Sequence, residues 1–354
     1  MMSKVLMKGN EAIGAAAIKA GCKAFFGYPI TPQNEIPEYM SREMAKSGGV
    51  FVQAESEVAA INMVYGAAGA GVRVMTSSSS PGIALKQEGI TYIAGAELPC
   101  VIVDVSRGGP GLGSIQPSQG DYFIATRGGG NGDYRHIALA PASIQEAVDL
   151  VTEAFDIADY YRNPVFVLAD GMIGQMMEPV EFHDMLSREL PEKTWATDGT
   201  KNSRKPNIIN SLALDPAVLE EHNIKLDKKY QQMERNEVRV EVFNMEEAEV
   251  VLTAYGTTAR VAKNAIELLE AEGIKAGLIR PITLWPFPHQ AFQEIPETAK
   301  AILTVEMSMG QMIDDVKIAN EGRLPVHFYG RSGGMCPEPQ AIVDKVKEIL
   351  GGVK

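Results

Sequence analysis

Arg107 and the serines at positions 77–80 are the side chains whose chemistry is plainest in this sequence. Arg107 follows an apolar run and precedes several glycines, which let the backbone approach a ligand closely. An arginine at the carboxyl end of a strand is suited to bidentate capture of a carboxylate. The serines stand before Pro81 at a predicted helix start, where free N–H groups could meet an anion or a polar ligand, although ordinary helix capping also explains them.

Two further segments add a hydroxyl and a carboxylate. In residues 28–32 (YPITP), two prolines fix the backbone and predict a rigid turn around Thr31. In residues 54–60 (AESEVAA), Ser56 is a plausible helix N-cap and Glu57 falls in the first helical turn. Each segment has an ordinary explanation, because prolines are common in turns and a helix dipole favours an acid at its start. Neither segment alone predicts a site.

Short apolar runs alternate with helical stretches from residue 9 to about residue 170, which is the pattern of consecutive βα units around a mostly parallel sheet. Each of the four segments follows one of the runs expected to be a strand. Because the carboxyl ends of parallel strands meet at one edge of a sheet, we expect the four segments to line one cleft. Their convergence, rather than any single segment, predicts a ligand site.

The alternation fails between Gly171 and about Glu246, where the chain is polar and rich in turn formers, and this segment predicts a linker with local helices. Order returns beyond it with further strands and helices, ending in a helix expected over residues 337–350. A chain of 354 residues exceeds the usual span of one hydrophobic core. We therefore expect two α/β domains, of which the second is the smaller.

The net charge of the chain limits the classes of partner that it is expected to bind. A formal net charge of −12 and a pI near 5.0 repel a polyphosphate backbone, and no basic run offsets that field, which disfavours nucleic acid. The amino terminus lacks the apolar core of a signal peptide, and no stretch reaches the roughly 18 apolar residues that cross a bilayer. We expect a cytoplasmic protein without a membrane segment.

Nucleotide and metal motifs are missing from the sequence. The glycine-rich loops match neither the dinucleotide fingerprint nor the P-loop, which disfavours an NAD-dependent dehydrogenase. The five histidines have no ligand spacing, so no metal site is predicted. Cys22, Cys100 and Cys336 stand far apart, so this chain alone cannot hold zinc or an Fe–S cluster, and all three are expected to be reduced core residues.

The chain closely resembles the α-type subunit of the 2-oxoacid:ferredoxin oxidoreductases along nearly its whole length. The motifs that carry the resemblance are GNEAI, AGCKAFFGYPITPQ, QAESEVAAINMVYGAA, TSSSSPGIAL, GAELPCVIVDVSRGGPG, QPSQGDYF and RNPVFVLADGMIGQ. Within the family, SSSSPG and RGGPGLGSIQPSQGDYF are most similar to the subunit that acts on 2-oxoisovalerate, a branched-chain 2-oxo acid. The 2-oxoglutarate and pyruvate branches remain the alternatives.

The resemblance implies a two-part α/β architecture. Residues 1–190 would form the pyrimidine-binding domain of a thiamine diphosphate enzyme, built on a parallel sheet. Residues 191–246 would be a linker segment. Residues 247–354, with VLTAYGTTARVAKNAIELL, LIRPITLWPFP and GRSGGMCPEP, would form a domain like the carboxyl-terminal domain of transketolase.

The resemblance also implies roles for single residues. Glu57 would be the catalytic glutamate that hydrogen-bonds the aminopyrimidine ring of thiamine diphosphate, so that the cofactor acts as its own base. Thr31 and Arg107 would bind the 2-oxo acid, with the arginine at its carboxylate. The cofactor-binding wall would comprise Tyr28, Pro29, Ile30, Glu57, Ser79 and Ser80.

The missing motifs imply partner subunits. Thiamine enzymes bind the diphosphate and Mg²⁺ through a GDG segment, and this chain contains none. The resemblance therefore implies a β subunit that binds the diphosphate and Mg²⁺, and γ and δ subunits with ferredoxin-type [4Fe–4S] clusters. Coenzyme A would be the co-substrate and ferredoxin the electron acceptor. The chain would be one wall of a shared site and inactive alone.

Overall fold

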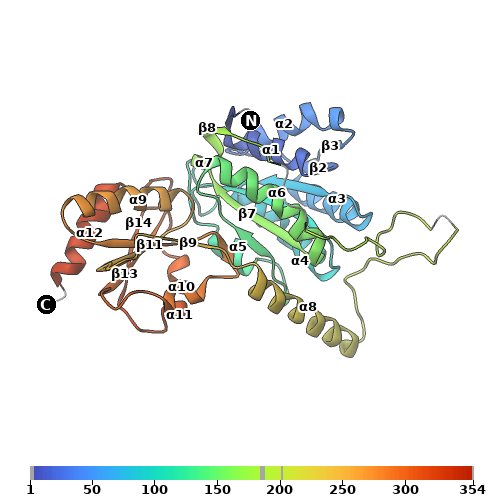
Figure 1. The fold of residues 1–354 in the computed structure, drawn as a ribbon. Helices are drawn as coiled ribbons and strands as arrows, with labels where there is room; N and C mark the ends of the chain where they lie inside the picture. Colours follow the sequence, from blue (N-terminus) through green and yellow to red (C-terminus); the bar gives the residue numbers. More distant parts are fainter. Residues whose placement is uncertain (1–3, 184–187, 201, 353–354) are drawn as a thin grey trace.

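The computed structural model describes residues 4–183, 188–200 and 202–352, which form two sheets with helices on their faces (Figure 1). The first sheet has seven strands in the order β12-β6-β7-β5-β4-β2-β3. All are parallel except β12, which runs antiparallel to β6. Their bounds are β2 (Ala24–Gly27), β3 (Val50–Gln53), β4 (Val74–Ser78), β5 (Cys100–Ser106), β6 (Ile137–Leu139), β7 (Pro164–Asp170) and β12 (Thr283–Trp285).

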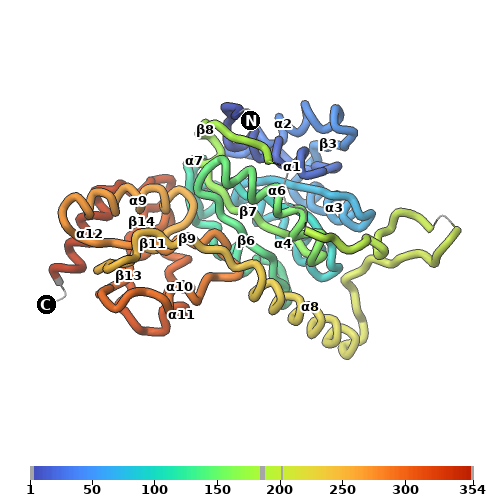
Figure 2. The backbone as a smooth tube through the Cα atoms, in the orientation of Figure 1, coloured from blue at the N-terminus to red at the C-terminus, as the bar shows by residue number. Residues whose placement is uncertain are grey.

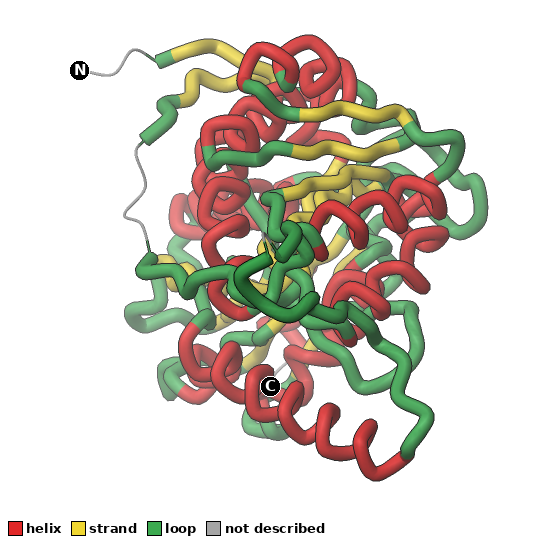
Figure 3. The backbone as a smooth tube through the Cα atoms, turned by 90° about the vertical axis from the view of Figure 1, so that its right-hand side faces the viewer, coloured by secondary structure: helices red, strands yellow, loops and turns green. Residues whose placement is uncertain are grey.

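Helices cover both faces of the first sheet (Figure 3). The strand β5 shows why, because Val101, Val103 and Val105 join the core on one face while Cys100 and Ile102 join the core on the other. One face is covered by α1 (Gly9–Lys19), α2 (Glu35–Glu43) and α6 (Ile144–Tyr161), and the other by α3 (Glu57–Gly69), α4 (Ser80–Gly95) and α5 (Tyr122–Arg127). The 3₁₀ turn η1 (Ala45–Ser47) extends α2.

The second sheet has five strands in the order β14-β13-β10-β11-β9. They are β9 (Val240–Phe243), β10 (Val250–Thr253), β11 (Ala276–Pro281), β13 (Ala301–Glu306) and β14 (Val326–Gly330), and only β9 is antiparallel to its neighbour. The helices α9 (Gly256–Ala271) and α12 (Pro339–Gly352) pack on one face. The helices α10 (His289–Gln293) and α11 (Met312–Asn320) pack on the other. The two expected α/β sheets are therefore present.

The polar segment between the sheets contains more order than a linker with local helices. It holds α7 (Gly171–Gln175), β8 (Met177–Val180), the 21-residue α8 (Pro216–Asn236) and β9. The strand β8 pairs with β1 (Val5–Lys8), and β9 belongs to the second sheet. Only three residues of α8, spaced at i, i+4 and i+7, are buried, so the helix has a narrow apolar stripe that its polar sequence concealed: Leu226, Tyr230 and Met233. The domain division at residues 190 and 246 stays a prediction.

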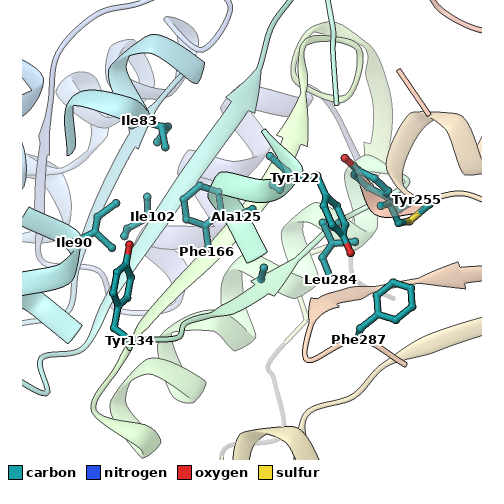
Figure 4. Close-up of a cluster of buried hydrophobic side chains, with 14 of the residues drawn as sticks. Ile83, Ile90, Ile102, Tyr122, Ala125, Tyr134, Phe166, Tyr255, Leu284 and Phe287 are labelled. Carbon is teal, nitrogen blue, oxygen red and sulfur yellow. The ribbon is translucent and has the colours of Figure 1, made fainter. Parts of the chain in front are cut away.

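The two sheets share one hydrophobic core. A single cluster of buried side chains runs from Ile83 and Ile102 beside the first sheet, through Tyr122, to Tyr255 and Phe287 of the second half (Figure 4). The chain also returns to the first sheet, where β12 pairs with the edge strand β6. The two halves therefore pack against each other through a shared core and a shared strand pairing.

A buried carboxamide fastens this junction. Gln119 Nε2 donates to the carbonyl of Tyr255 at 2.8 Å, and its Oε1 accepts from Thr258 Oγ1 at 3.1 Å and from Met307 N at 2.9 Å. At the other end of the junction, Arg280 forms a bidentate pair with Glu146, with two N···O distances of 2.8 Å. These bonds fix the second half against the carboxyl edge of the first sheet.

Candidate functional site

The four loops expected to line a cleft lie at the carboxyl ends of four neighbouring strands. The order β5-β4-β2-β3 places the loops after these strands next to one another, and these are the loops that carry Arg107, the serines, Thr31 and Glu57. Open parallel sheets bind ligands at this edge. The convergence that the sequence predicted is thus present in the fold.

Arg107 and Thr31 are in direct contact. Arg107 Nη1 donates to the backbone carbonyl of Thr31 at 2.9 Å, and Nη2 donates to the carbonyl of Leu112 at 2.8 Å. The side chain is only 8% exposed, and its Nε is buried without a partner among the described residues. A buried donor without an acceptor is uncommon in a folded protein and suits a group that meets a ligand.

Glu57 is the first residue of α3 and is only 6% exposed. The helix is capped as the sequence predicted, because Ser56 Oγ accepts from Ala59 N at 3.1 Å. The Glu57 carboxylate accepts no hydrogen bond from the residues that the structure describes. Ser56 makes the capping bond, so this buried acid is left available for another group.

The serines do not act as ordinary caps. Ser79 occupies the N-cap of α4 but makes no capping bond, and the hydroxyls of Ser78 and Ser79 are buried without partners among the described residues. Ser80 Oγ instead accepts from Arg107 N at 2.9 Å and lies in hydrogen-bond contact with Asp121. The capping alternative therefore does not account for this cluster, and a polar ligand could satisfy the two free hydroxyls.

Three expected wall residues lie in the turn after β2. Tyr28 and Pro29 are exposed and Ile30 is half-buried, so this turn presents its surface outward. Gln33 fastens the turn from below, since its Nε2 donates to the carbonyl of Tyr28 at 3.3 Å while its Oε1 accepts from Ser77 Oγ at 2.5 Å. The turn is thus supported on β4.

Two buried acids below the cleft were missed by sequence reasoning. Asp104 lies in the apolar strand β5, and Ser80 N donates to its Oδ1 at 3.2 Å. Burial raises the pKa of Asp104 well above its usual range, and the nearby carboxyl of Asp121 raises it further. A single aspartate inside the run CVIVDV was a signal, because a charged residue in a central strand needs a partner.

A cavity of about 670 Å³ opens beside Thr31 and is lined by both halves of the chain. Its walls include Pro32, Ile115 and Met172 from the first half and Cys336 from the second. The expectation that all three cysteines are core residues is wrong for Cys336, which is half-buried in this wall because the glycines before it bring its loop against residues 108–116. Cys22 and Cys100 are buried as expected, and burial raises the pKa of each thiol to about 12.

Neither a metal cluster nor a membrane helix is found in the described ranges. No group of three or more His, Cys, Asp or Glu side chains there could hold a metal ion. None of the described helices combines the length and the apolar character required to cross a bilayer.

Comparison with known proteins assigns the chain to a class. The family model described as "Pyruvate flavodoxin/ferredoxin oxidoreductase, thiamine diP-bdg" matches residues 15–246. The model described as "Pyruvate:ferredoxin oxidoreductase core domain II" matches residues 248–342. The first half is therefore a thiamine diphosphate-binding α/β domain, as its parallel sheet and polar carboxyl edge indicated.

Similar proteins extend over the full chain. The ketoisovalerate oxidoreductase subunit VorB of Methanothermobacter marburgensis is 52% identical over 99% of each chain. The 2-oxoglutarate synthase subunit KorA of Methanocaldococcus jannaschii is 36% identical over 96% of this chain and 98% of its own. The chain belongs to the 2-oxoacid:ferredoxin oxidoreductase family and is one subunit of such an oxidoreductase, which confirms the resemblance to its α-type subunit.

Solved structures agree with this assignment. The 2-oxoglutarate:ferredoxin oxidoreductase from Magnetococcus marinus, with 2-oxoglutarate, coenzyme A and succinyl-CoA bound, superposes with a TM-score of 0.89 at 30% identity, over 99% of this chain and 66% of that one. A split-gene transketolase superposes with a TM-score of 0.60 at 16% identity, over 98% of each chain. The transketolase-like α/β fold expected from the sequence is confirmed.

Proposed function

We propose that this chain forms the aminopyrimidine and substrate wall of an enzyme that oxidatively decarboxylates branched-chain 2-oxo acids, with 2-oxoisovalerate preferred. The acid would lose CO₂, pass its acyl group to coenzyme A and deliver two electrons, one at a time, to ferredoxin. The contact between Arg107 and Thr31 beside an apolar cavity supports the proposal. A 2-oxoglutarate or pyruvate specificity is the alternative.

The residues present fit the pyrimidine side of thiamine diphosphate. When bound, this cofactor supplies a carbanion that adds to the 2-oxo carbonyl group. Glu57 would accept or donate the proton at the ring nitrogen, since its carboxylate is buried and accepts no hydrogen bond from the residues that the structure describes. The free hydroxyls near the start of α4 support a polar ligand there. The wall would comprise Tyr28, Pro29, Ile30, Ser79 and Ser80.

Arg107 and Thr31 would bind the 2-oxo acid. Arg107 would present its remaining N–H groups to the substrate carboxylate. Its hydrogen bond to the carbonyl of Thr31 fixes the orientation of the guanidinium. The Thr31 hydroxyl, which accepts from Asn34 Nδ2 at 3.4 Å, would point a second polar group at the same ligand. Arg107 and Thr31 would thus orient the substrate, whereas Glu57 would exchange a proton with the cofactor.

The cavity beside Thr31 supports an apolar side chain on the substrate. Its apolar lining residues are Pro32, Ile115, Pro117, Met172 and Met176. Among the described residues no lysine or arginine lines it, and Glu35 is the one charged residue that does. Burial raises the pKa of Glu35, but hydrogen bonds from Asn10, Gln175 and Lys8 outweigh this and lower it. The ionised Glu35 would repel the distal carboxylate of 2-oxoglutarate.

Partner subunits would complete the enzyme. We place the diphosphate, Mg²⁺ and [4Fe–4S] clusters on a β subunit and on γ and δ subunits, with the complex in the cytoplasm. Exposed apolar side chains support such a partner, because Ile208, Leu212 and Leu214 are 87%, 67% and 88% exposed on the segment that leads from the protruding loop back to α8 (Figure 2). Several large apolar side chains exposed on one short segment favour a surface that another chain covers.

Assays of the assembled complex test the proposal. We expect a higher kcat/KM for 2-oxoisovalerate than for 2-oxoglutarate or pyruvate, and no 2-oxo acid oxidation by the isolated chain with ferredoxin as acceptor. Met172→Arg, which adds a cation to the cavity, should shift the preference toward 2-oxoglutarate. Met177→Arg on the exposed face of β8 is the matched control and should leave the preference unchanged. A wild-type kcat/KM that is higher for 2-oxoglutarate would contradict the substrate assignment.

A further inference from the structure

Lys86 is a fully buried lysine in the middle of α4. Its Nζ donates to Thr76 Oγ1 at 2.7 Å and to the carbonyl of Ser77 at 2.9 Å, so two of its three N–H groups bind the carboxyl end of β4. A lysine is almost never fully buried without compensating charge or hydrogen bonds. Its neighbours therefore decide what the ammonium group does.

Two glycines bring α4 against the helix that carries Glu57. A Cβ built on Gly82 would lie 2.7 Å from Glu57 Oε1, and one built on Gly89 would lie 2.5 Å from Cγ2 of Ile61. Lys86 stands four residues after Gly82 and three before Gly89, on the same helical face. The face that carries Lys86 thus packs directly onto the first turns of α3, where Glu57 begins the helix.

Two carboxyl groups face the Lys86 ammonium. Glu57 of α3 and Asp104 of β5 both favour its charged form, and Asp121 lies behind Asp104. Burial nevertheless lowers the pKa of Lys86. Glu57 and Asp104 oppose this shift, and the resulting pKa is about 7. The β4 groups at Thr76 and Ser77 are uncharged. Asp104 accepts a hydrogen bond from Ser80 N, whereas Glu57 accepts none from the part of the chain that the structure describes.

We propose that Lys86 is a positioning residue that acts through Glu57: its ammonium group stabilises the anionic form of that carboxylate and directs it toward the aminopyrimidine ring. The proposal rests on the proposed function of the cleft. A cation behind a carboxylate makes the carboxyl group a stronger acid. Loss of the Lys86 cation would therefore weaken the interaction between the Glu57 carboxylate and the ring nitrogen.

A titration of Lys86 in the cofactor-free, full-length chain tests the contact directly. With ¹³Cε-labelled lysine, the Lys86 resonance is the one that Lys86→Met removes, or Lys86→Arg if the methionine variant does not fold. Glu57→Gln should lower the titration midpoint of Lys86 by about one pH unit, because it removes the anion that favours the ammonium form. Glu55→Gln, at an exposed position two residues away, is the matched control and should leave the midpoint in place. An unchanged midpoint in Glu57→Gln would overturn the proposal.

A second measurement separates this inference from the proposed function. In the assembled complex, Lys86→Met should slow hydrogen–deuterium exchange at C2 of bound thiamine diphosphate at least tenfold. Lys229→Met is the control, because Lys229 is a mostly buried lysine on α8 that pairs with Glu97, outside the cleft. Equal exchange in Lys86→Met and wild type, with Glu57→Gln still slow, would overturn the role of Lys86 alone. Normal exchange in Glu57→Gln would overturn the proposed function of Glu57 itself.

Discussion

Arg107 Nη1 donates a hydrogen bond of 2.9 Å to the backbone carbonyl of Thr31, across 76 positions of the sequence. The same guanidinium reaches the carbonyl of Leu112, so one side chain fastens its own glycine-rich loop to the turn after β2. Two residues proposed to bind one substrate are therefore held in a fixed relation before any ligand arrives. Such preorganisation reduces the ordering cost of binding.

Arg107→Lys should lower kcat/KM for the 2-oxo acid by roughly 10- to 100-fold. A lysine ammonium is a point charge that cannot hold Thr31 and a carboxylate at once, and charge-assisted bonds of this kind are worth about 1.5 to 3 kcal/mol. Steady-state kinetics of the assembled complex measure the effect, and thiamine diphosphate affinity should hardly change. A complex that dissociates while KM stays the same would instead identify Arg107 as an interface residue.

Glu57→Gln should abolish most cofactor activation while the chain still folds. The amide keeps the shape of the side chain but cannot exchange the proton, so C2 exchange of bound thiamine diphosphate and 2-oxo acid turnover should fall by orders of magnitude. If Glu57 only complemented the helix dipole, the change would cost about 0.3 to 1 kcal/mol of stability and leave exchange intact. Glu55→Gln on the same loop supplies the unaffected comparison.

Gln119→Ala should lower the free energy of unfolding by about 1 to 3 kcal/mol. It leaves the N–H of Met307 buried without its acceptor, and an unsatisfied buried group costs about 1 to 3 kcal/mol, whereas the carbonyl of Tyr255 still accepts from Ala259 N and Thr258 Oγ1. Urea unfolding of the chain measures the loss. The exposed neighbour Gln116 is the control, and Gln116→Ala should shift the midpoint little.

His136→Phe should remove part of the acid sensitivity of the fold. Burial lowers the pKa of His136 to about 4, from an ordinary value of 6.5. Between pH 6.5 and 4 the unfolded chain takes up the proton first, so wild-type stability falls as the pH falls through this window. The stability difference should move in favour of the variant by roughly 3 kcal/mol between pH 7 and 4. His289→Gln, at an exposed position, should show no such gain.

The strands and helices of both sheets followed closely from periodicity. The alternation of apolar runs with helical stretches from residue 9 to about residue 170 predicted the parallel first sheet, and the return of order beyond residue 246 predicted the second, because buried strands leave a strong local pattern. The strand β12 could not be found in this way. It has three residues, and its partner β6 lies in the other half of the chain, so tertiary context alone defines it.

The polar segment was harder to interpret for the same physical reason. The helix α8 is mostly exposed, so its sequence lacks the wide apolar face that identifies an amphipathic helix. Its Pro216 after Asp215 was an available signal, since Asp215 caps the helix through Ala217 N at 2.9 Å. The sequence predicted a linker here because three buried side chains in a helix of 21 residues produce only a weak hydrophobic periodicity.

The sequence predicted the loop residues of the candidate site but not the buried charged residues that support them. Loop position after parallel strands was enough to group Thr31, Glu57 and Arg107, because topology alone brings such loops together. The supporting groups Lys86, Asp104 and Asp121 were not found, although two of them interrupt apolar stretches. Only the packing of α4 on α3 shows which charge each of them faces.

The pairing of β12 with β6 has a consequence for how the chain is made. During synthesis, residues 137–139 emerge well before residues 283–285, so β6 waits with an open edge of unpaired N–H and C=O groups. A fragment that stops at residue 246 would lack β12 and would keep that edge unpaired. The first sheet therefore reaches its full set of strands only after residues 283–285 have been made.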